Sequence, residues 1–192
     1  ANVEAIKLLK YLEETTEQAT PEQQKILSRY VGWGGLADAF DPDKESWSKE
    51  YAQLKELLTP EEYAAARGST LNAHYTSPTV IKAIMRSSAA SDVYKRQAVG
   101  RMGFETGNIL EPSCGVGNFF GMLPEEMRNS RLYGVELDSI SGRIAQQLYP
   151  KADITVAGFE TTDRRDFYDL AVGNVPFGQY QVRDKAYDKL NF

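Results

Sequence analysis

A short segment with two glycines carries the first residues that could do chemistry. Residues 111–119 read Glu-Pro-Ser-Cys-Gly-Val-Gly-Asn-Phe and directly follow the apolar run Asn-Ile-Leu, which is typical of a strand. Gly115 and Gly117 let the backbone turn sharply and approach a ligand closely. Glu136 ends the next β-rich run, 19 residues after Gly117, and a carboxylate there can accept hydrogen bonds from both hydroxyls of a ribose. The spacing predicts a nucleoside site; the alternative is an ordinary strand-to-helix turn followed by a surface glutamate.

The glycine pattern also bears on the kind of cofactor. A dinucleotide-binding loop has a third glycine that favours a pyrophosphate, and here Phe120 stands in its place. We therefore expect a nucleoside cofactor without phosphates, S-adenosylmethionine in preference to NAD, and a dehydrogenase is disfavoured. With one cysteine and one histidine in the chain, we expect neither a disulfide framework nor a metal site.

A second polar segment follows the last β-rich run of the chain. Residues 173–178 read Gly-Asn-Val-Pro-Phe-Gly, directly after Tyr-Asp-Leu-Ala-Val. This position puts Asn174 at the carboxyl end of a strand, which is where open α/β sheets bind their ligands. The carboxyl edge of one sheet is therefore predicted to hold both polar segments.

The elements that must position these residues alternate from residue 108 onward. Short β-rich segments alternate with amphipathic, helix-like segments, and this order predicts a parallel, doubly wound sheet. The β-rich segments are NILEP, RLYGVEL, ADITVA and YDLAVGN, and the helix-like segments NFFGMLPEEM and SISGRIAQQLY lie between the first three.

Residues 1–70 have a different pattern, which predicts helices. Apolar residues recur at near-helical spacing from Val3 to Leu12. Thr20-Pro21 and Thr59-Pro60 are typical helix starts, each with Gln or Glu three residues after the threonine. Between them, Gly32, Gly34 and Gly35 surround Trp33. This loop is either a helix stop with a buried tryptophan or a loop that faces substrate or DNA.

Composition excludes some broad classes of protein. No apolar run approaches 18 residues, so we expect no membrane span. The chain begins as an acidic amphipathic helix in place of a signal peptide, which favours a cytoplasmic location. A net charge of −5 argues against a basic, sequence-blind nucleic-acid coat, although an enzyme with a local basic groove stays open.

Residues 87–97 do not fit the surrounding pattern. They read Ser-Ser-Ala-Ala-Ser-Asp-Val-Tyr-Lys-Arg-Gln, which is, position for position, the translation of a common transposase-based sequencing adapter. Without them, apolar residues on both sides fall on one helical stripe: Ile81, Ile84, Met85, Val99 and Met102. We interpret 87–97 as an artefactual insertion; the alternative is a natural surface insertion.

Taken together, the segments resemble a known family. Glu-Pro-x-x-Gly-x-Gly after the first strand, with Asn-x-Pro-Phe after the fourth, is similar to the signature of amino-group methyltransferases. The order, with Tyr-Thr-Ser-Pro at 75–78 before both, resembles the gamma class of N6-adenine DNA methyltransferases. More narrowly, YVGWGGLADAF, HYTSPTVIKAI, ILEPSCGVGNFFGMLP and VGNVPFG resemble the methylase domain of very large methylase–helicase proteins of phages, plasmids and conjugative elements.

The resemblance covers essentially the whole chain outside 87–97, and it implies an architecture. The fold would be α/β, a partial Rossmann-like S-adenosylmethionine-dependent methyltransferase fold with the first four strands of a seven-stranded sheet. An α-helical N-terminal region, 1–70, would precede the N-terminal part of the methyltransferase domain, 71–192. We then expect the rest of a larger polypeptide, with a possible helicase region, beyond these residues, and this piece alone to be poorly stable and inactive.

The resemblance also implies roles for particular residues. The methionine end of the cofactor would be bordered by Tyr75, Thr76 and Pro78. The loop beneath the cofactor would be formed by Glu111, Pro112, Gly115 and Gly117. Glu136 would hold the ribose, and Phe159 would cover the adenine. The family has an aspartate before that aromatic residue, where this chain has Gly158; Asp153 and Glu160 are the acidic residues that could replace it.

The expected reaction is methylation of the N6 amine of a flipped adenine in DNA. The implied catalytic residues are Asn174, Val175, Pro176 and Phe177. Val175 replaces a proline of the family, but the family uses only the backbone carbonyl there. Gly158 and Val175 favour one alternative, a non-catalytic cofactor- or DNA-binding module of a helicase or anti-restriction protein. A protein-glutamine N5-methyltransferase is the other, because Asn-Pro-Pro-Tyr/Phe also serves that chemistry.

Overall fold

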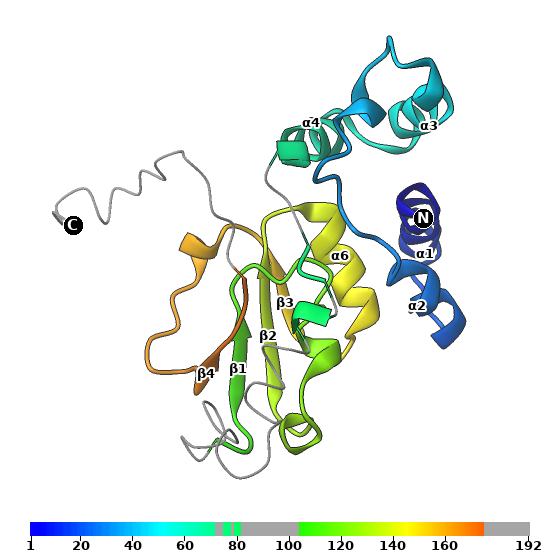
Figure 1. Ribbon diagram of the computed structural model, residues 1–192. Coiled ribbons are helices and arrows are strands. Elements are labelled where there is room, and N and C mark those ends of the chain that lie inside the picture. Colours follow the sequence, from blue (N-terminus) through cyan, green and yellow to red (C-terminus); the bar gives the residue numbers. More distant parts are fainter. Residues whose placement is uncertain (72–74, 78, 82–103, 175–192) are drawn as a thin grey trace, which may run out of the picture.

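Four parallel strands form a single sheet in the computed structural model, which describes residues 1–71, 75–77, 79–81 and 104–174 (Figure 1). The strands are β1 (Asn108–Glu111), β2 (Arg131–Glu136), β3 (Asp153–Val156) and β4 (Leu170–Ala171), in the spatial order β3-β2-β1-β4. This is the order of the first four strands of a doubly wound nucleotide-binding sheet. The predicted α/β, Rossmann-like fold with a parallel sheet is confirmed.

The register of the strands brings their carboxyl ends to one edge. Glu111 pairs with Gly134, and Glu136, two residues further along β2, pairs with Val156 of β3. The chain adds β2 and β3 on one side of β1 and β4 on the other. The edge between β1 and β4 is therefore a topological switch point, where open α/β sheets leave a crevice for ligands.

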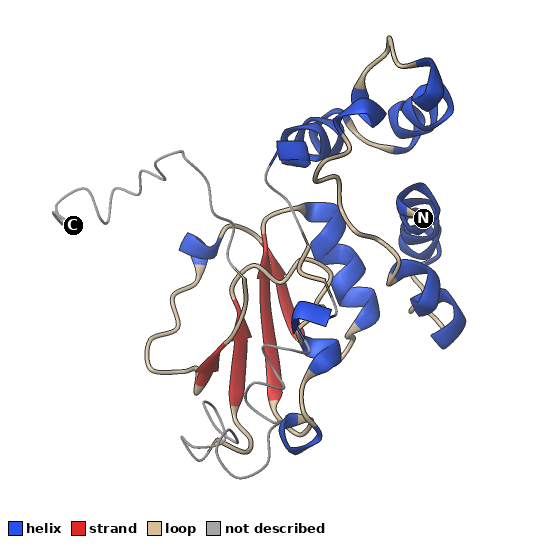
Figure 2. Cartoon of the chain, viewed as in Figure 1, coloured by secondary structure: helices blue, strands red, loops and turns tan. Residues whose placement is uncertain are grey.

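Residues 1–71 form helices, as their pattern predicts, and these gather away from the strands (Figure 2). The α-helices are α1 (Asn2–Thr15), α2 (Pro21–Leu27), α3 (Ser48–Leu57) and α4 (Pro60–Gly68), and the 3-10 helices are η1 (Ala37–Phe40), η2 (Glu45–Trp47) and η3 (Ser69–Leu71). Thr20 and Thr59 both form complete capping boxes with the residue three positions later, so the two predicted helix starts are confirmed.

Helix α6 (Ser139–Leu148) joins the helical region to the sheet. It lies between the strands on one side and α1 and α2 on the other (Figure 1). Ile140 and Ile144 of α6 belong to the same cluster of buried side chains as Ile6, Leu9 and Leu27 of α1 and α2. The helical region therefore does not have a separate hydrophobic core.

Trp33 is the buried anchor that one interpretation of its loop predicts. The residue is 3% exposed, and its ring makes edge contacts with Tyr30 and Phe40 at centroid distances of 6.5 and 5.1 Å. Such edge-to-face packing of aromatic rings fixes a loop more firmly than burial alone.

The prediction of one continuous helix between β1 and β2 is wrong. Residues 118–127 form two short 3-10 helices, η4 (Phe120–Met122) and η5 (Glu125–Met127). Pro124 is the cause, because proline lacks an N–H donor and disfavours helical backbone in the residue before it. Leu123 accordingly has φ −57° and ψ 138°. The segment still packs on the sheet, on the side of Ile81 and Ile109.

Two further sequence predictions concern the described residues only in part. The stripe that begins at Ile81, and the segment 87–97 within it, lie outside the described residues beyond Ile81. Within the parts of the chain that the structure describes, no helix is long and apolar enough to cross a membrane.

A network of partly buried ion pairs links the helical region to α6. The Glu62 carboxylate accepts hydrogen bonds from Lys10 Nζ at 2.7 and 2.8 Å and forms an ion pair with Arg143. Arg143 also donates to both carboxylate oxygens of Glu13, each at 2.8 Å. Burial by itself would raise the pKa of Glu62, but Lys10, the Thr59 amide and Arg143 hold it below its ordinary value.

We predict that Glu62→Gln lowers the free energy of unfolding at pH 7 by roughly 1–3 kcal/mol. Glutamine keeps the capping box, so the change isolates the charge. Because the native pKa of Glu62 is depressed, the advantage of the wild type is present above pH 4.5 and is lost as the pH falls through the native pKa. Urea unfolding followed by circular dichroism at several pH values measures this, and the exposed Glu61→Gln is the matched control. Equal losses for both variants would contradict the prediction.

Candidate active site

Three chain segments meet at the carboxyl ends of β1 and β4. Gly173 lies beside the end of β1: a Cβ there would be in ordinary contact with Pro112 Cδ at 3.4 Å and Glu111 Cγ at 3.5 Å. Asn174, the next residue, donates a hydrogen bond from Nδ2 to Thr76 Oγ1 at 3.1 Å. Residues predicted separately, from positions 98 apart in the chain, therefore lie side by side.

The glycine loop is held by Glu136. Gly115 and Gly117 have φ of +54° and +81°, which residues with a side chain rarely adopt. The Glu136 carboxylate accepts the Gly115 N–H at 2.6 Å through one oxygen and the Asp138 N–H at 2.8 Å through the other. Each carboxylate oxygen can accept a second hydrogen bond, so the capacity to bind ribose hydroxyls remains.

Glu111 is a buried carboxyl group with an unsatisfied oxygen. The residue is 2% exposed, and neither its Oε2 nor the buried Oγ of Ser113, two residues later, has a hydrogen-bond partner among the described residues. Burial, and then the nearby charge of Glu136, raise the pKa of Glu111 to about 9. Two buried polar atoms without partners, close together in the ligand loop (residues 111–117), indicate that a polar or cationic group of a ligand belongs there.

Two exposed apolar side chains stand at the same edge. Phe159 begins the short helix η6 (Phe159–Thr161) after β3 and is 52% exposed, and Leu137, directly after β2, is 76% exposed. The sequence singled out Phe159 but not Leu137. An apolar residue immediately after the acidic strand end, Glu136, was the available signal.

The structure distinguishes between the two acidic residues near Gly158. A Cβ on Gly158 would overlap the carboxylate of Glu160, so the Glu160 side chain fills the space that a side chain at 158 would enter. Asp153 is the first residue of β3, at the opposite end of the strand, and pairs with Arg164 at 3.3 Å. Only Glu160 is therefore near the position of the missing aspartate.

Tyr75 reaches the glycine loop from the segment after the helical region. Its hydroxyl forms a hydrogen bond with Ser141 Oγ on α6, and burial raises the pKa of this phenol. The remaining predicted site residues, Pro78, Val175, Pro176 and Phe177, lie outside the described residues.

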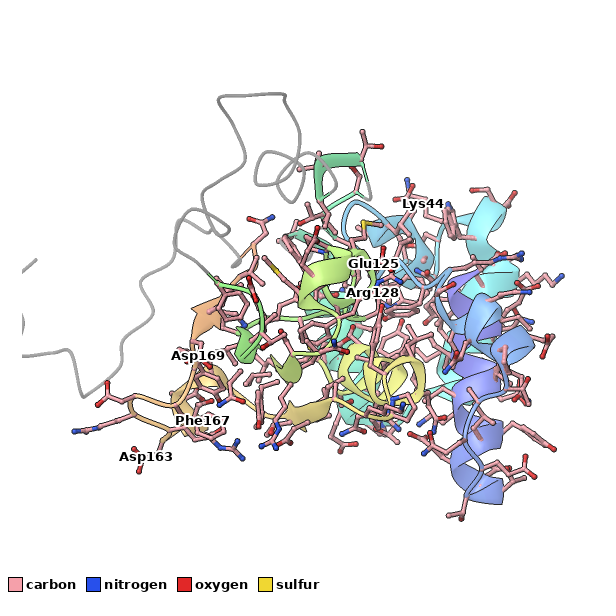
Figure 3. All side chains as sticks on the ribbon, turned by 90° about the horizontal axis from the view of Figure 1, so that it is seen from below. Lys44, Glu125, Arg128, Asp163, Phe167 and Asp169 are labelled. Carbon is pink, nitrogen blue, oxygen red and sulfur yellow. The ribbon has the colours of Figure 1, made fainter. Side chains whose placement is uncertain are left out.

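A small cavity lies elsewhere, on the face of β2 and β3 turned away from α6. Its volume is about 130 Å³, and it is bounded by the strands and residues 161–168. Arg164 covers it, with its guanidinium 5.2 Å from the Tyr133 ring and 4.8 Å from the Phe167 ring. Phe167 and Asp169 lie on the segment that leads into β4 (Figure 3), and both accept hydrogen bonds from Asn108. Of the described residues that the sequence singled out, Asp153 alone lines this cavity.

Comparison with known proteins finds partial matches to methyltransferases and to a phage protein. No family model matches the chain. Over 74 residues it is 42% identical to the type II methyltransferase M.CvrRI of Paramecium bursaria Chlorella virus XZ-6E, which is 38% of this chain and 19% of that protein. Over 181 residues it is 28% identical to Defense against restriction protein B of Escherichia phage P1, which is 93% of this chain and 6% of that protein.

A solved structure also matches, at low similarity. It is a Listeria monocytogenes protein assigned as a class I S-adenosylmethionine-dependent methyltransferase, 15% identical, with a TM-score of 0.33 over 94% of this chain and 61% of that one. The matched residues span only 19% of the viral methyltransferase and 6% of the phage P1 protein. Partial sequence similarity to a type II methyltransferase is what these comparisons establish.

We predict that the raised pKa of Glu111 makes the wild-type chain lose stability as the pH rises. The native carboxyl keeps its proton up to about pH 9, whereas in the unfolded chain it ionises near pH 4.5. Ionisation therefore favours unfolding between these values. In Glu111→Gln this slope is absent, so the variant gains up to about 1.4 kcal/mol over the wild type for each pH unit between pH 5 and pH 9. The exposed Glu105→Gln is the control in denaturant titrations; pH profiles that run parallel in wild type and Glu111→Gln would contradict the assignment.

Proposed function

We propose that the whole protein to which these residues belong is an S-adenosylmethionine-dependent DNA methyltransferase that acts on the N6 amine of adenine. The observation that carries the proposal is the contact of Asn174 with Thr76 beside the glycine loop. Partial similarity to a type II methyltransferase supports the same chemistry.

The residues present fit this cofactor. The unsatisfied Glu111 Oε2 and Ser113 Oγ match an ammonium group such as that of the methionine moiety, which would also stabilise the ionised form of Glu111. Glu136 would accept the ribose hydroxyls, and Phe159 and Leu137 offer apolar surface for the adenine ring. Thr76, beside Asn174, would border the methionine end together with Tyr75 and Pro78.

Asn174 would act on the amine of the target base. The lone pair of this amine is conjugated into the purine ring, so the nitrogen is a poor nucleophile. Because Asn174 donates its Nδ2 hydrogen to Thr76, the amide oxygen is left to accept one hydrogen of the amine. The carbonyl of Val175 would accept the other, and together they favour a tetrahedral nitrogen whose lone pair is localised.

Methyl transfer then needs little beyond orientation. When bound, S-adenosylmethionine would supply an electrophilic methyl group to the amine nitrogen, with its sulfonium sulfur as the leaving group. The amine would then lose one proton to water. Holding the two groups in line supplies much of the rate enhancement. Phe177 would stack on the adenine, which must leave the duplex to reach this edge.

A second candidate is a non-catalytic module of an anti-restriction protein. Similarity to Defense against restriction protein B extends over 93% of the chain, and Gly158 and Val175 depart from the family pattern. Such a module would keep the cofactor or DNA contacts without methyl transfer. Association with a helicase region or with a restriction–modification system on a mobile element belongs to the same proposal about the longer protein.

We predict that Asn174→Ala in the full-length protein lowers the rate of methyl transfer to DNA by about 100-fold or more, because it removes one hydrogen bond that orients the nucleophile. The dissociation constant of S-adenosylmethionine should change by less than about threefold, since the cofactor contacts lie on other residues. Transfer of radiolabelled methyl groups and calorimetric titration measure the two quantities.

The same assay separates the alternatives. Methyl groups recovered as N6-methyladenine support the proposal, whereas label in protein glutamine favours the N5-methyltransferase. No transfer by the wild type, with cofactor or DNA binding retained, favours the non-catalytic module. Undiminished transfer by Asn174→Ala would refute the catalytic role of this residue.

We also predict that Glu160 serves in place of the aspartate absent at 158. If its carboxylate accepts a hydrogen bond from the exocyclic amine of the cofactor, Glu160→Gln weakens S-adenosylmethionine binding roughly three- to tenfold. Inosine in place of adenosine in the cofactor should then remove or reverse the difference, because its O6 atom accepts hydrogen bonds and only the glutamine can donate one. Asp153→Asn, which alters the pair with Arg164 at the far end of β3, is the matched control and should bind normally. Equal affinities of wild type and Glu160→Gln would exclude the contact.

A further inference from the structure

The Gly-rich loop of the helical region touches the candidate site through one side chain. Gly32 has φ +69°, and a Cβ on this residue would overlap the Tyr75 ring, whose Cδ2 would be only 3.0 Å away. A Cβ on Gly115 of the ligand loop would overlap the opposite edge of the same ring, and it would lie only 2.8 Å from Tyr75 Cδ1. The Tyr75 ring therefore lies between the backbones of two glycines, one from each part of the chain.

The position of Gly32 is fixed by the helical region. Asn2, at the start of α1, is buried; its Nδ2 donates to Gly32 O at 2.6 Å and its Oδ1 accepts the Val31 N–H at 3.0 Å. Further along the loop, the Gly35 N–H donates to Thr70 O at 2.9 Å. The loop backbone is thus held at both ends and forms a firm surface behind Tyr75.

The other side of Tyr75 meets the residues that hold the ligand loop. Ser141 donates its hydroxyl hydrogen to Asp138, so the Tyr75 hydroxyl is the donor in its hydrogen bond to Ser141. The Asp138 amide in turn binds Glu136, whose carboxylate also holds Gly115. Any displacement of the ring would therefore reach Gly115 directly and Glu136 through α6.

We propose that Gly32 is a positioning residue for the cofactor site. Its missing side chain lets the helical region press the Tyr75 ring against Gly115, and this contact sets the conformation of residues 112–117 in which the cofactor is bound. The inference rests on the proposed function, because it assigns S-adenosylmethionine to that loop. It gives the loop of residues 30–35 a second role, in addition to carrying the buried Trp33.

The loop itself supplies the matched control. Gly35 has φ +74°, close to the value at Gly32, yet a Cβ on Gly35 would have nothing within 4 Å. Gly32→Ala and Gly35→Ala therefore introduce the same backbone strain, and they differ in the contact with Tyr75. A purely structural role would lower the unfolding temperature of Gly32→Ala without changing the affinity of the folded chain for the cofactor.

The experiment measures S-adenosylmethionine binding to the full-length protein by calorimetry, at a temperature where each variant is folded. We expect Gly32→Ala to weaken binding at least tenfold and Gly35→Ala less than threefold. Tyr75→Leu should also weaken binding, and adding Gly32→Ala to it should change nothing further, because the ring that transmits the effect is gone.

The outcomes separate this inference from the proposed function. If the wild type binds no S-adenosylmethionine, the proposed cofactor is wrong and the inference falls with it. If the wild type binds and Gly32→Ala binds as tightly as Gly35→Ala, only the inference is overturned. Independent, additive effects of Gly32→Ala and Tyr75→Leu would overturn it as well.

Discussion

Helix α6 is buried from two directions, and this double burial determines where the other elements lie. Toward the sheet, Gly142 lets the helix approach so closely that a Cβ there would lie 2.8 Å from Val156 Cγ2. Toward the helical region, Ile140 and Ile144 complete the cluster formed by α1 and α2. Two polar residues of α6 make further specific contacts: Ser141 with Tyr75, and Arg143 with Glu13 and Glu62. A helix that was only a cover for the sheet would need none of these partners.

The same geometry places two buried acidic groups at the carboxyl edge. Glu111 and Glu136 end neighbouring strands, and both are shielded from water, so burial raises the pKa of each. The two carboxyls differ in their partners: backbone amides satisfy Glu136, whereas Glu111 keeps an unsatisfied oxygen. Glu136 thus stabilises the ligand loop in the absence of a ligand, while the environment of Glu111 becomes favourable only when a hydrogen-bond donor or cation arrives.

The sequence predicts what depends on local patterns. Strands follow from β-rich runs, and the two capping boxes follow from a threonine, a proline and an acid or amide at fixed spacing. The α-helix predicted for residues 118–127 is absent because Pro124 interrupts it, although this proline is itself a local signal in the sequence. Contacts between distant residues carry no such signal: the Tyr75 ring between Gly32 and Gly115, or Glu160 in the space beside Gly158, depends on how whole elements pack. Alternation and spacing cannot encode that packing.

The Glu62 carboxylate both caps α4 and binds cations of α1 and α6, and this double use determines how the protein unfolds. Its Oε2 accepts the Thr59 N–H at the start of α4, while the same group receives Lys10 of α1 and Arg143 of α6. Helix α4 therefore cannot fray at its first turn without loosening its docking, and undocking removes the acceptor that the first turn needs. Local and tertiary structure are coupled at this point, so the Thr59 amide exchanges its hydrogen through the opening of a larger cooperative unit and not through the independent breathing of a helix end.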